Sequence, residues 1–201
     1  MKTEDKKNMS LEIAALVKKT REGNRIGFQE LVNMFQGDIY RLAYYRTFSQ
    51  MDAEDLTQEV FEQAYKKLDS LQDPQRFRSW LYSIAVNRCN DFLRKRKYLA
   101  MLQMRKAREQ DFDSTGTDMD NSYDDRIEKK RFWKQVKSML SKLSSMEREV
   151  FILRFMDHRN INEIAVILNK NESTIKTHLY RALNKVREQS DFFKEYRESI
   201  L

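Results

Sequence analysis

The stretch Asn160–Arg187, NINEIAVILNKNESTIKTHLYRALNKVR, contains two short amphipathic segments joined at residues 168–171. Asn160 and Asn171 stand where each segment would begin, and asparagine is among the best helix N-caps. Asn169 stands where the first segment must end, and asparagine tolerates the left-handed conformation that closes a helix. The pattern predicts a helix-turn-helix, whose second helix can enter the major groove of DNA.

Helical spacing divides the second segment into two faces. The face predicted to point inward carries apolar residues: Ile175, Leu179, Ala182, Leu183 and Val186. The outer face carries the candidates for contacts with bases or phosphates: Ser173, Thr174, Lys176, Thr177, Tyr180 and Arg181. A helical hairpin that only packs could show the same spacing, but the two caps, the short turn and the polar outer face favour DNA reading.

Only 4 Gly and 1 Pro occur in the 201 residues, which is too few to form the many tight turns of an all-β fold. Apolar residues recur at helical spacing elsewhere in the chain, so we expect an all-α protein of two small helical domains. The single proline lies in Asp69–Ser79, which is predicted to be a connecting loop. The predicted helices are Ser10–Glu22 (capped by Ser10 and stopped by Gly23), Asn24–Phe48 (weakened at Gly37), Asp52–Leu68 (capped by Asp52), Trp80–Lys97, Arg126–Leu143 and a capping-box helix from Ser144 to about Met156.

The formal net charge of +7 suits a polyanionic partner, and the charge is unevenly distributed. Residues 88–108 hold 8 basic and 1 acidic residue, whereas residues 109–125 hold 7 acidic residues and no basic one. The acidic stretch is rich in Asp, Ser, Thr and Gly, which is typical of a flexible linker. Two basic zones separated by an acidic linker indicate contact with DNA at two places.

The predicted helix Asp52–Leu68 has an acidic face opposite its apolar stripe. The acidic face is made of Asp55, Gln58, Glu59 and Glu62. Three interpretations are open: a solvated surface, a docking face for a basic partner, or a metal-dependent nuclease site using Asp52, Asp55 and Glu59. The sequence supplies no clustered His and no nucleophile near these carboxylates, which counts against the nuclease.

Several classes of site are not expected. Cys89 is the only cysteine and lies in an apolar-periodic stretch, so it is predicted to be a core residue in a reducing compartment. His158 and His178 have no further ligands at metal-binding spacing, so no metal and no cofactor are predicted. The first residues, MKTEDKKNMS, lack the apolar run of a signal peptide. No apolar run in the chain approaches the length needed to span a membrane, so we expect a cytoplasmic protein.

Taken in order, the motifs resemble those of the extracytoplasmic-function (ECF) sigma factors, small bacterial promoter-specificity subunits of RNA polymerase. The resemblance rests on GNRIGFQELVNMFQGDIYRLAYY, DAEDLTQEVFEQAYKKL, FRSWLYSIAVNRCNDFLRKRK, LSSMEREVFILRF and the stretch from Asn160 to Arg187. Two departures are the missing proline near Ser145 and the replacement of glycines of the helix-turn-helix by Asn169 and Ser173. These departures leave the family resemblance intact, but promoter sequence cannot be carried over.

The resemblance implies a division into sigma regions. It predicts an N-terminal helix at 1–22, region 2 at 23–97, a linker at 98–125, region 4 at 126–190 and a tail at 191–201. The acidic face would dock on the clamp coiled coil of the largest polymerase subunit, and the recognition helix would read the −35 element. The −10 element would be recognised and melted by the Asp69–Ser79 loop and the following helix, through Arg76, Arg78, Trp80, Asn87, Arg88, Asp91 and Arg94.

The resemblance also implies partners: core RNA polymerase, promoter DNA and an anti-sigma factor. Residues Val150–Phe155 would face the polymerase flap. Such a factor is a transcription initiation factor rather than an enzyme. The alternative is a stand-alone helix-turn-helix regulator, which would bind duplex DNA tightly without polymerase and would give the acidic face no role.

Overall fold

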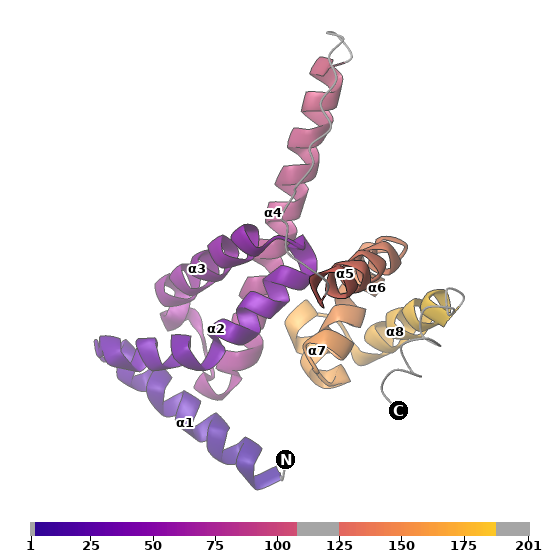
Figure 1. Cartoon of the computed structure of the whole chain (residues 1–201). Helices are drawn as coiled ribbons and strands as arrows, with labels where there is room; N and C mark the ends of the chain where they lie inside the picture. Colours follow the sequence, from indigo (N-terminus) through magenta and orange to yellow (C-terminus); the bar gives the residue numbers. More distant parts are fainter. Residues whose placement is uncertain (1–2, 108–124, 188–201) are drawn as a thin grey trace. The chain divides into compact units, whose positions relative to one another are not determined.

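The computed structural model describes residues 3–107 and 125–187, which contain helices and no strand. These residues form two compact units. Figure 1 labels the helices along the chain. One unit contains residues 3–93 and 152–175, and the other contains 94–107, 125–151 and 176–187. The predicted linker residues 109–124 and the predicted tail lie outside the described residues.

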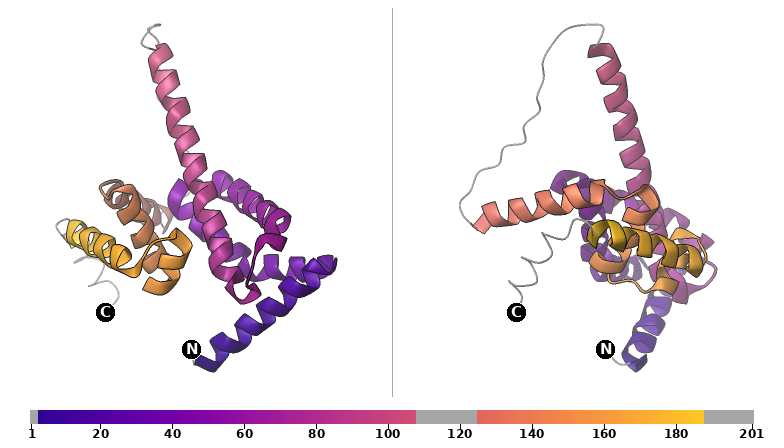
Figure 2. Two further views of the ribbon diagram at one scale, coloured as in Figure 1. Left: turned by 180° about the vertical axis from the view of Figure 1, so that it is seen from behind. Right: turned by 90° about the vertical axis from the view of Figure 1, so that its right-hand side faces the viewer.

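The N-terminal elements of the chain are α1 (Thr3–Arg21), α2 (Arg25–Thr47), α3 (Gln50–Lys67) and α4 (Phe77–Ala107). Two short 3-10 turns, η1 (Leu68–Ser70) and η2 (Pro74–Arg76), replace the plain loop predicted between α3 and α4. Helix α4 is continuous in both views of Figure 2, so residues 98–107, which were assigned to the linker, belong to the helix.

The helix ends differ from the predictions where a better cap lies nearby. Helix α1 begins at Thr3, so the predicted start at Ser10 is wrong, whereas Gly23 ends the turn with a φ of 91° as expected. Ser49 caps α3 by accepting a hydrogen bond from the amide of Asp52, so Asp52 is not the cap. Gly37 does not interrupt α2, because one glycine costs a well-packed helix only about 1 kcal/mol.

A continuous core joins α2, α3 and α4. Its side chains come from the apolar stripes that the helical spacing predicted, with Tyr82 as the largest member. The most buried residues are Leu31, Phe35, Ile39, Leu42, Leu56, Val60, Ala64, Phe77, Leu81, Ala85 and Cys89. In α1, by contrast, Leu11 is apolar but half exposed.

Helix α1 packs closely against the start of α2. At Gly27 an added Cβ atom would lie 2.9 Å from Thr20 Oγ1 and 3.1 Å from the carbonyl oxygen of Leu16. The Thr20 hydroxyl already donates to that same carbonyl at 2.8 Å. The two helices can therefore approach this closely because residue 27 has no side chain.

The C-terminal elements are α5 (Asp125–Ser141), α6 (Ser145–Phe151), η3 (Ile152–Met156), α7 (Ile161–Leu168) and α8 (Glu172–Arg187). The element η3 is a π-helix, so the helix predicted to run to Met156 changes its hydrogen-bonding register after Phe151. The predicted capping box is present: the Ser144 amide donates to Glu147 Oε2 at 2.9 Å, and the Glu147 amide donates to Ser144 Oγ at 3.4 Å.

Glu147 also joins α6 to α8 within its unit. Its side chain is 6% exposed and accepts a hydrogen bond from Lys185 Nζ at 2.7 Å. The hydrogen bond from Lys185 holds the pKa of Glu147 below its ordinary value, and the bonds to Ser144 act in the same direction. The ionised carboxylate of Glu147 therefore stabilises the folded unit.

The helix-turn-helix has the predicted caps. Asn160 and Glu163 form a reciprocal capping box, and Asn169 adopts the left-handed conformation with a φ of 51°. Asn171 Oδ1 accepts from the amide of Thr174 at 2.8 Å, as the sequence predicted. The prediction that Leu183 points inward was wrong. Leu183 is 40% exposed, because Ala182 and Val186 already fill the buried side of this turn of α8.

We expect Glu147→Gln to lower the free energy of unfolding at pH 7 by about 1 kcal/mol, because it removes a charge from a capped ion pair. The pKa of Glu147 is lower in the folded state, so its contribution is present above the ordinary value of 4.5 and is lost as the pH falls through the folded pKa. Urea unfolding at pH 7 and pH 3 should show the two proteins converging in acid. An equal difference at both pH values would contradict the assignment, and Glu30→Gln serves as the exposed control.

The two glycines of α2 give a matched pair of substitutions. We expect Gly27→Ala to destabilise the fold by about 1–2 kcal/mol, because the overpacking against Leu16 and Thr20 exceeds the gain in helix propensity. At Gly37 the nearest atom to an added Cβ is 3.7 Å away, so Gly37→Ala should stabilise by about 0.5–1 kcal/mol. Thermal unfolding followed by circular dichroism measures both, and equal gains would refute the close approach at Gly27.

Candidate docking face and nucleic-acid interface

The acidic face predicted on the third helix lies on α3 as a single exposed surface. Asp55, Gln58, Glu59 and Glu62 are all exposed. They face away from the core because Leu56, Val60 and Ala64 are buried on the other side of the helix. The Gln58 amide donates to Glu62 Oε1 at 3.0 Å, which ties two members of the face together.

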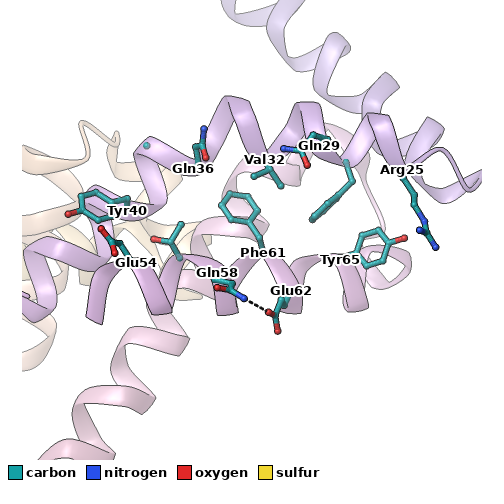
Figure 3. Close-up of a pocket in the computed structure, with 13 residues that line it drawn as sticks. Arg25, Gln29, Val32, Gln36, Tyr40, Glu54, Gln58, Phe61, Glu62 and Tyr65 are labelled. Carbon is teal, nitrogen blue, oxygen red and sulfur yellow. Dashed lines mark hydrogen bonds between the residues drawn. The ribbon is translucent and has the colours of Figure 1, made fainter. Parts of the chain in front are cut away.

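A groove between α2 and α3 adjoins this face (Figure 3). Phe28, Val32 and Phe61 form its apolar part, and Gln58 and Glu62 stand on its α3 side. Phe28 and Val32 lie at the apolar spacing of the predicted helix Asn24–Phe48, but both are only partly buried. Helical spacing alone could not show which apolar residues of α2 would be left uncovered by α3.

The groove also carries polar residues at the end marked by Tyr40 and Glu54 in Figure 3. Burial raises the pKa of the Tyr40 hydroxyl, and the carboxylate of Glu54 raises it further. Tyr40 therefore stays neutral at physiological pH and can donate a hydrogen bond. An apolar floor with polar rims is the form of surface that accepts an amphipathic helix.

One ion pair connects two predicted sites. Arg88 Nη2 of α4 lies 2.5 Å from Glu59 Oε2 of α3. Glu59 was predicted to bind a protein partner and Arg88 to bind DNA, and spacing along the chain gave no sign that they meet. Both side chains are more than one-third exposed, so the pair is reachable from solvent and contributes modestly to stability.

The region from η2 to the start of α4 positions three of the predicted DNA-binding residues. Arg76 is exposed and lies 3.5 Å from Asp73, which caps η2 by accepting from the Gln75 amide. Arg78 is half-buried, with its guanidinium carbon 5.6 Å from the centre of the Phe35 ring. Trp80 is half-buried as well, and its ring centre lies 5.8 Å from that of Phe77. Each of the three residues therefore has a supporting contact and an exposed part.

Sequence reasoning missed Asp38 of α2 as part of this region. Its carboxylate lies 3.6 Å from Arg78 Nη2 and accepts a hydrogen bond from the Tyr82 hydroxyl at 3.1 Å. Tyr82 is buried, and this burial raises the pKa of its hydroxyl, which remains a hydrogen-bond donor. Asp38 therefore holds Arg78 from a neighbouring helix, and only the three-dimensional structure shows this contact.

The remaining predicted residues of α4 form an exposed polar strip. Asn87, Asp91 and Arg94 are exposed and recur at i, i+4 and i+7, so they lie on one side of the helix. Arg88 lies beside this strip and is pinned by Glu59. The strip continues into the basic residues that precede Tyr98.

The recognition-helix candidates lie at the start and outer side of α8. Ser173, Lys176, Thr177 and Arg181 are exposed, Tyr180 is 67% exposed, and Thr174 is partly buried. Ile175 is fully buried and fixes the rotation of this end of the helix. Amide groups at a helix start carry partial positive charge, which suits a DNA phosphate.

Within residues 3–107 and 125–187, no group of three or more His, Cys, Asp or Glu side chains is arranged to hold a metal ion. None of the helices in these ranges is long and apolar enough to cross a membrane.

Two family models match this combination of surfaces. Residues 31–98 match sigma-70 region 2, and residues 133–186 match sigma-70 region 4. Together the two matches span more than half of the chain. The chain belongs to the sigma-70 family of RNA polymerase sigma factors. The acidic face, the η1–η2 loop and the polar strip of α4 lie in the region 2 match, and the helix-turn-helix lies in the region 4 match.

Curated relatives place this sigma factor in the ECF group. It is 28% identical to the ECF RNA polymerase sigma factor SigW of Bacillus subtilis over 191 residues, covering 90% of this chain and 98% of SigW. It is 31% identical to the RNA polymerase sigma factor SigV of Bacillus subtilis over 152 residues, covering 76% of this chain and 84% of SigV. The resemblance stated from the motifs is therefore confirmed.

Solved structures share the fold. CnrH, solved in complex with the cytosolic domain of CnrY, has a TM-score of 0.67 at 24% identity, covering 90% of this chain and 97% of CnrH. The sigma factor RpoE from Bartonella quintana, solved with the anti-sigma factor NepR, has a TM-score of 0.57 at 24% identity, covering 80% of this chain and 94% of RpoE. Helix α1 precedes the residues that match region 2.

Proposed function

We propose that this sigma factor binds core RNA polymerase through α3 and directs promoter recognition, melting and initiation through two DNA-binding surfaces. The observation that carries the proposal is the placement of the acidic face and the polar strip of α4 on adjoining helices, both inside the region 2 match. The matches to two sigma regions favour this function over a stand-alone helix-turn-helix regulator.

The docking surface is the acidic face with the adjoining groove. Asp55, Gln58, Glu59 and Glu62 supply carboxylates and an amide for basic and polar groups of the clamp coiled coil. Binding would bury the apolar part of the groove, and burial of apolar surface is the main source of affinity. Charges on the rim steer the partner and select its orientation.

The −10 surface is the η1–η2 loop with the start and polar strip of α4. Melting requires bases to leave the stack, at a cost of about a few kcal/mol that contacts in the opened state must offset. The proposed contacts come from Arg76, Arg78, Trp80, Asn87, Arg88, Asp91 and Arg94. Basic side chains next to an aromatic ring suit an unpaired strand, because phosphates and base faces are both accessible there.

The −35 surface is the start and outer side of α8. Lys176 and Arg181 suit phosphates, which gives affinity without sequence choice. Ser173, Thr174, Thr177 and Tyr180 carry hydroxyl groups near the helix start, where a recognition helix reaches base edges. This separation assigns affinity and base choice to different side chains.

Further partners follow from the family and the solved relatives. Residues Val150–Phe155 would face the polymerase flap. The relatives CnrH and RpoE were solved with the cytosolic domain of CnrY and with the anti-sigma factor NepR, which supports an anti-sigma partner for this chain. The factor itself would catalyse no reaction, and it would act in the cytoplasm together with polymerase.

Reconstituted transcription tests the function and the docking face together. Purified protein added to a bacterial core polymerase should start RNA at a discrete set of promoters, mapped by sequencing the transcript ends. The double variant Asp55→Lys/Glu62→Lys should reduce core binding at least about tenfold, because it reverses two rim charges. Both changes avoid the Glu59–Arg88 pair.

Glu30→Lys is the control for the docking test, because Glu30 is an exposed acid of α2 that does not line the groove. It should bind core polymerase like the unchanged protein. Absence of promoter-dependent transcripts would refute the proposed function. Normal core binding by the double variant would refute only the docking face.

The recognition helix can be tested on the promoters mapped in this way. Arg181→Ala should weaken holoenzyme binding across −35 sequences and reduce the salt dependence by about one phosphate contact. Thr177→Val should change the preferred base at one −35 position with little change in salt dependence. Binding is measured on promoter fragments with varied −35 elements at several salt concentrations.

Lys142→Ala removes an exposed basic residue of region 4 outside the proposed surface and should leave −35 binding unchanged. If Thr177→Val and Arg181→Ala both reduced affinity equally for every sequence, the assignment of base choice to Thr177 would be wrong.

A further inference from the structure

Helix α1 ends beside the loop that we assign to the −10 element. Arg21, in the last turn of α1, donates from Nη2 to the carbonyl oxygen of Leu68 at 2.8 Å and also to that of Leu71. Its Nε lies 3.9 Å from the exposed carboxylate of Asp69. One guanidinium thus holds the main chain at both ends of the η1 turn.

The two carbonyls belong to the end of α3 and the turn that follows. Carbonyl groups at a helix C-terminus lack partners within the helix. The Leu68 carbonyl accepts a hydrogen bond from the Leu71 amide at 3.2 Å, and Arg21 adds a second, charged donor to it. A hydrogen bond from a charged guanidinium is stronger than one from a neutral group, and Nη2 of Arg21 carries two N–H bonds, one for each carbonyl. Arg21 has the geometry for both tasks.

The exposed part of the loop lies between two buried anchors. Leu71 is 5% exposed and Phe77 is fully buried, while Gln72, Asp73, Gln75 and Arg76 between them are exposed. Phe77 is fixed by the core of α4. The first anchor depends on the η1 turn and therefore on Arg21.

Helix α1 is itself firmly placed. Val17 is fully buried, and the close approach at Gly27 fixes the crossing with α2. Arg21 therefore reaches the loop from a rigid support that precedes the residues matching region 2. Contacts that select a base need supports accurate to about 0.5 Å, because small displacements weaken them strongly.

We propose that Arg21 is a positioning residue for −10 recognition: by holding the Leu68 and Leu71 carbonyls, it sets the conformation in which the exposed loop meets the unpaired bases. The inference rests on the proposed function of the loop. Arg21 touches the loop backbone and acts on DNA only through it.

The test uses reconstituted holoenzyme and a mapped promoter whose −10 and −35 elements are randomised separately. Transcript sequencing gives the base preference of each element. Arg21→Gln should lower discrimination at −10 positions by at least about threefold and leave −35 discrimination unchanged. Arg21→Lys should be intermediate, because the ammonium keeps the charge but sits on a flexible stem and its donors rotate freely, so it orients the two carbonyls less firmly.

Lys18→Gln is the matched control, since Lys18 is an exposed cation one turn earlier on α1. It removes the same charge and should keep both preferences. Hydrogen exchange of the free full-length chain supplies a second readout. The amides of residues 69–73, 75 and 76 should exchange faster in Arg21→Gln than in Lys18→Gln, while those of α3 should not.

Unchanged −10 discrimination in Arg21→Gln, or unchanged exchange of the loop amides, would overturn the inference. A parallel loss of −10 and −35 discrimination would also overturn it, because it would indicate general unfolding. Each of these outcomes would overturn the inference while the unchanged protein still gives promoter-dependent transcripts. If the unchanged protein gave no such transcripts, the proposed function would fall and this inference with it.

Discussion

Along one side of α3, Leu56, Val60 and Ala64 are withdrawn from water, and the surfaces of region 2 depend on this burial. The hydrophobic effect fixes the rotation of the helix, so its carboxylates face outward without needing partners of their own. The same rotation brings Glu59 to Arg88 on α4. One buried stripe therefore sets the acidic face, the side of the groove and the edge of the polar strip.

Local signals in the sequence predicted much of this arrangement. The helical periods gave the core stripes of α2, α3 and α4, and the capping boxes at Ser144 and Asn160 occur as predicted. Errors arose where two local signals compete. Ser49 and Asp52 can both cap a helix, and only the packing of the chain at Phe48, which closes α2 in a left-handed conformation, selects Ser49.

Features that depend on contacts distant in sequence could not be predicted. Nothing in the spacing of Phe28 and Val32 shows that α3 leaves them partly uncovered. The support of Arg78 by Asp38 joins two residues that lie 40 positions apart in the sequence, on different helices. The π-helical register after Phe151 follows no pattern of residue types. The residue assignments of the three binding surfaces stay predictions, because they describe contacts with partners.

The bonds from Arg21 end on main-chain carbonyls, and every residue type supplies such an oxygen. Side chains of the exposed loop can therefore be exchanged without removing the acceptors that support it. The main-chain bonds from Arg21 support the conformation of the loop, whereas its exposed side chains would make the contacts with DNA. If the loop reads the −10 element as proposed, new promoter preferences could be acquired by substitution at Gln72 or Gln75, while Asp73 and Pro74, which shape η2, are retained with the frame.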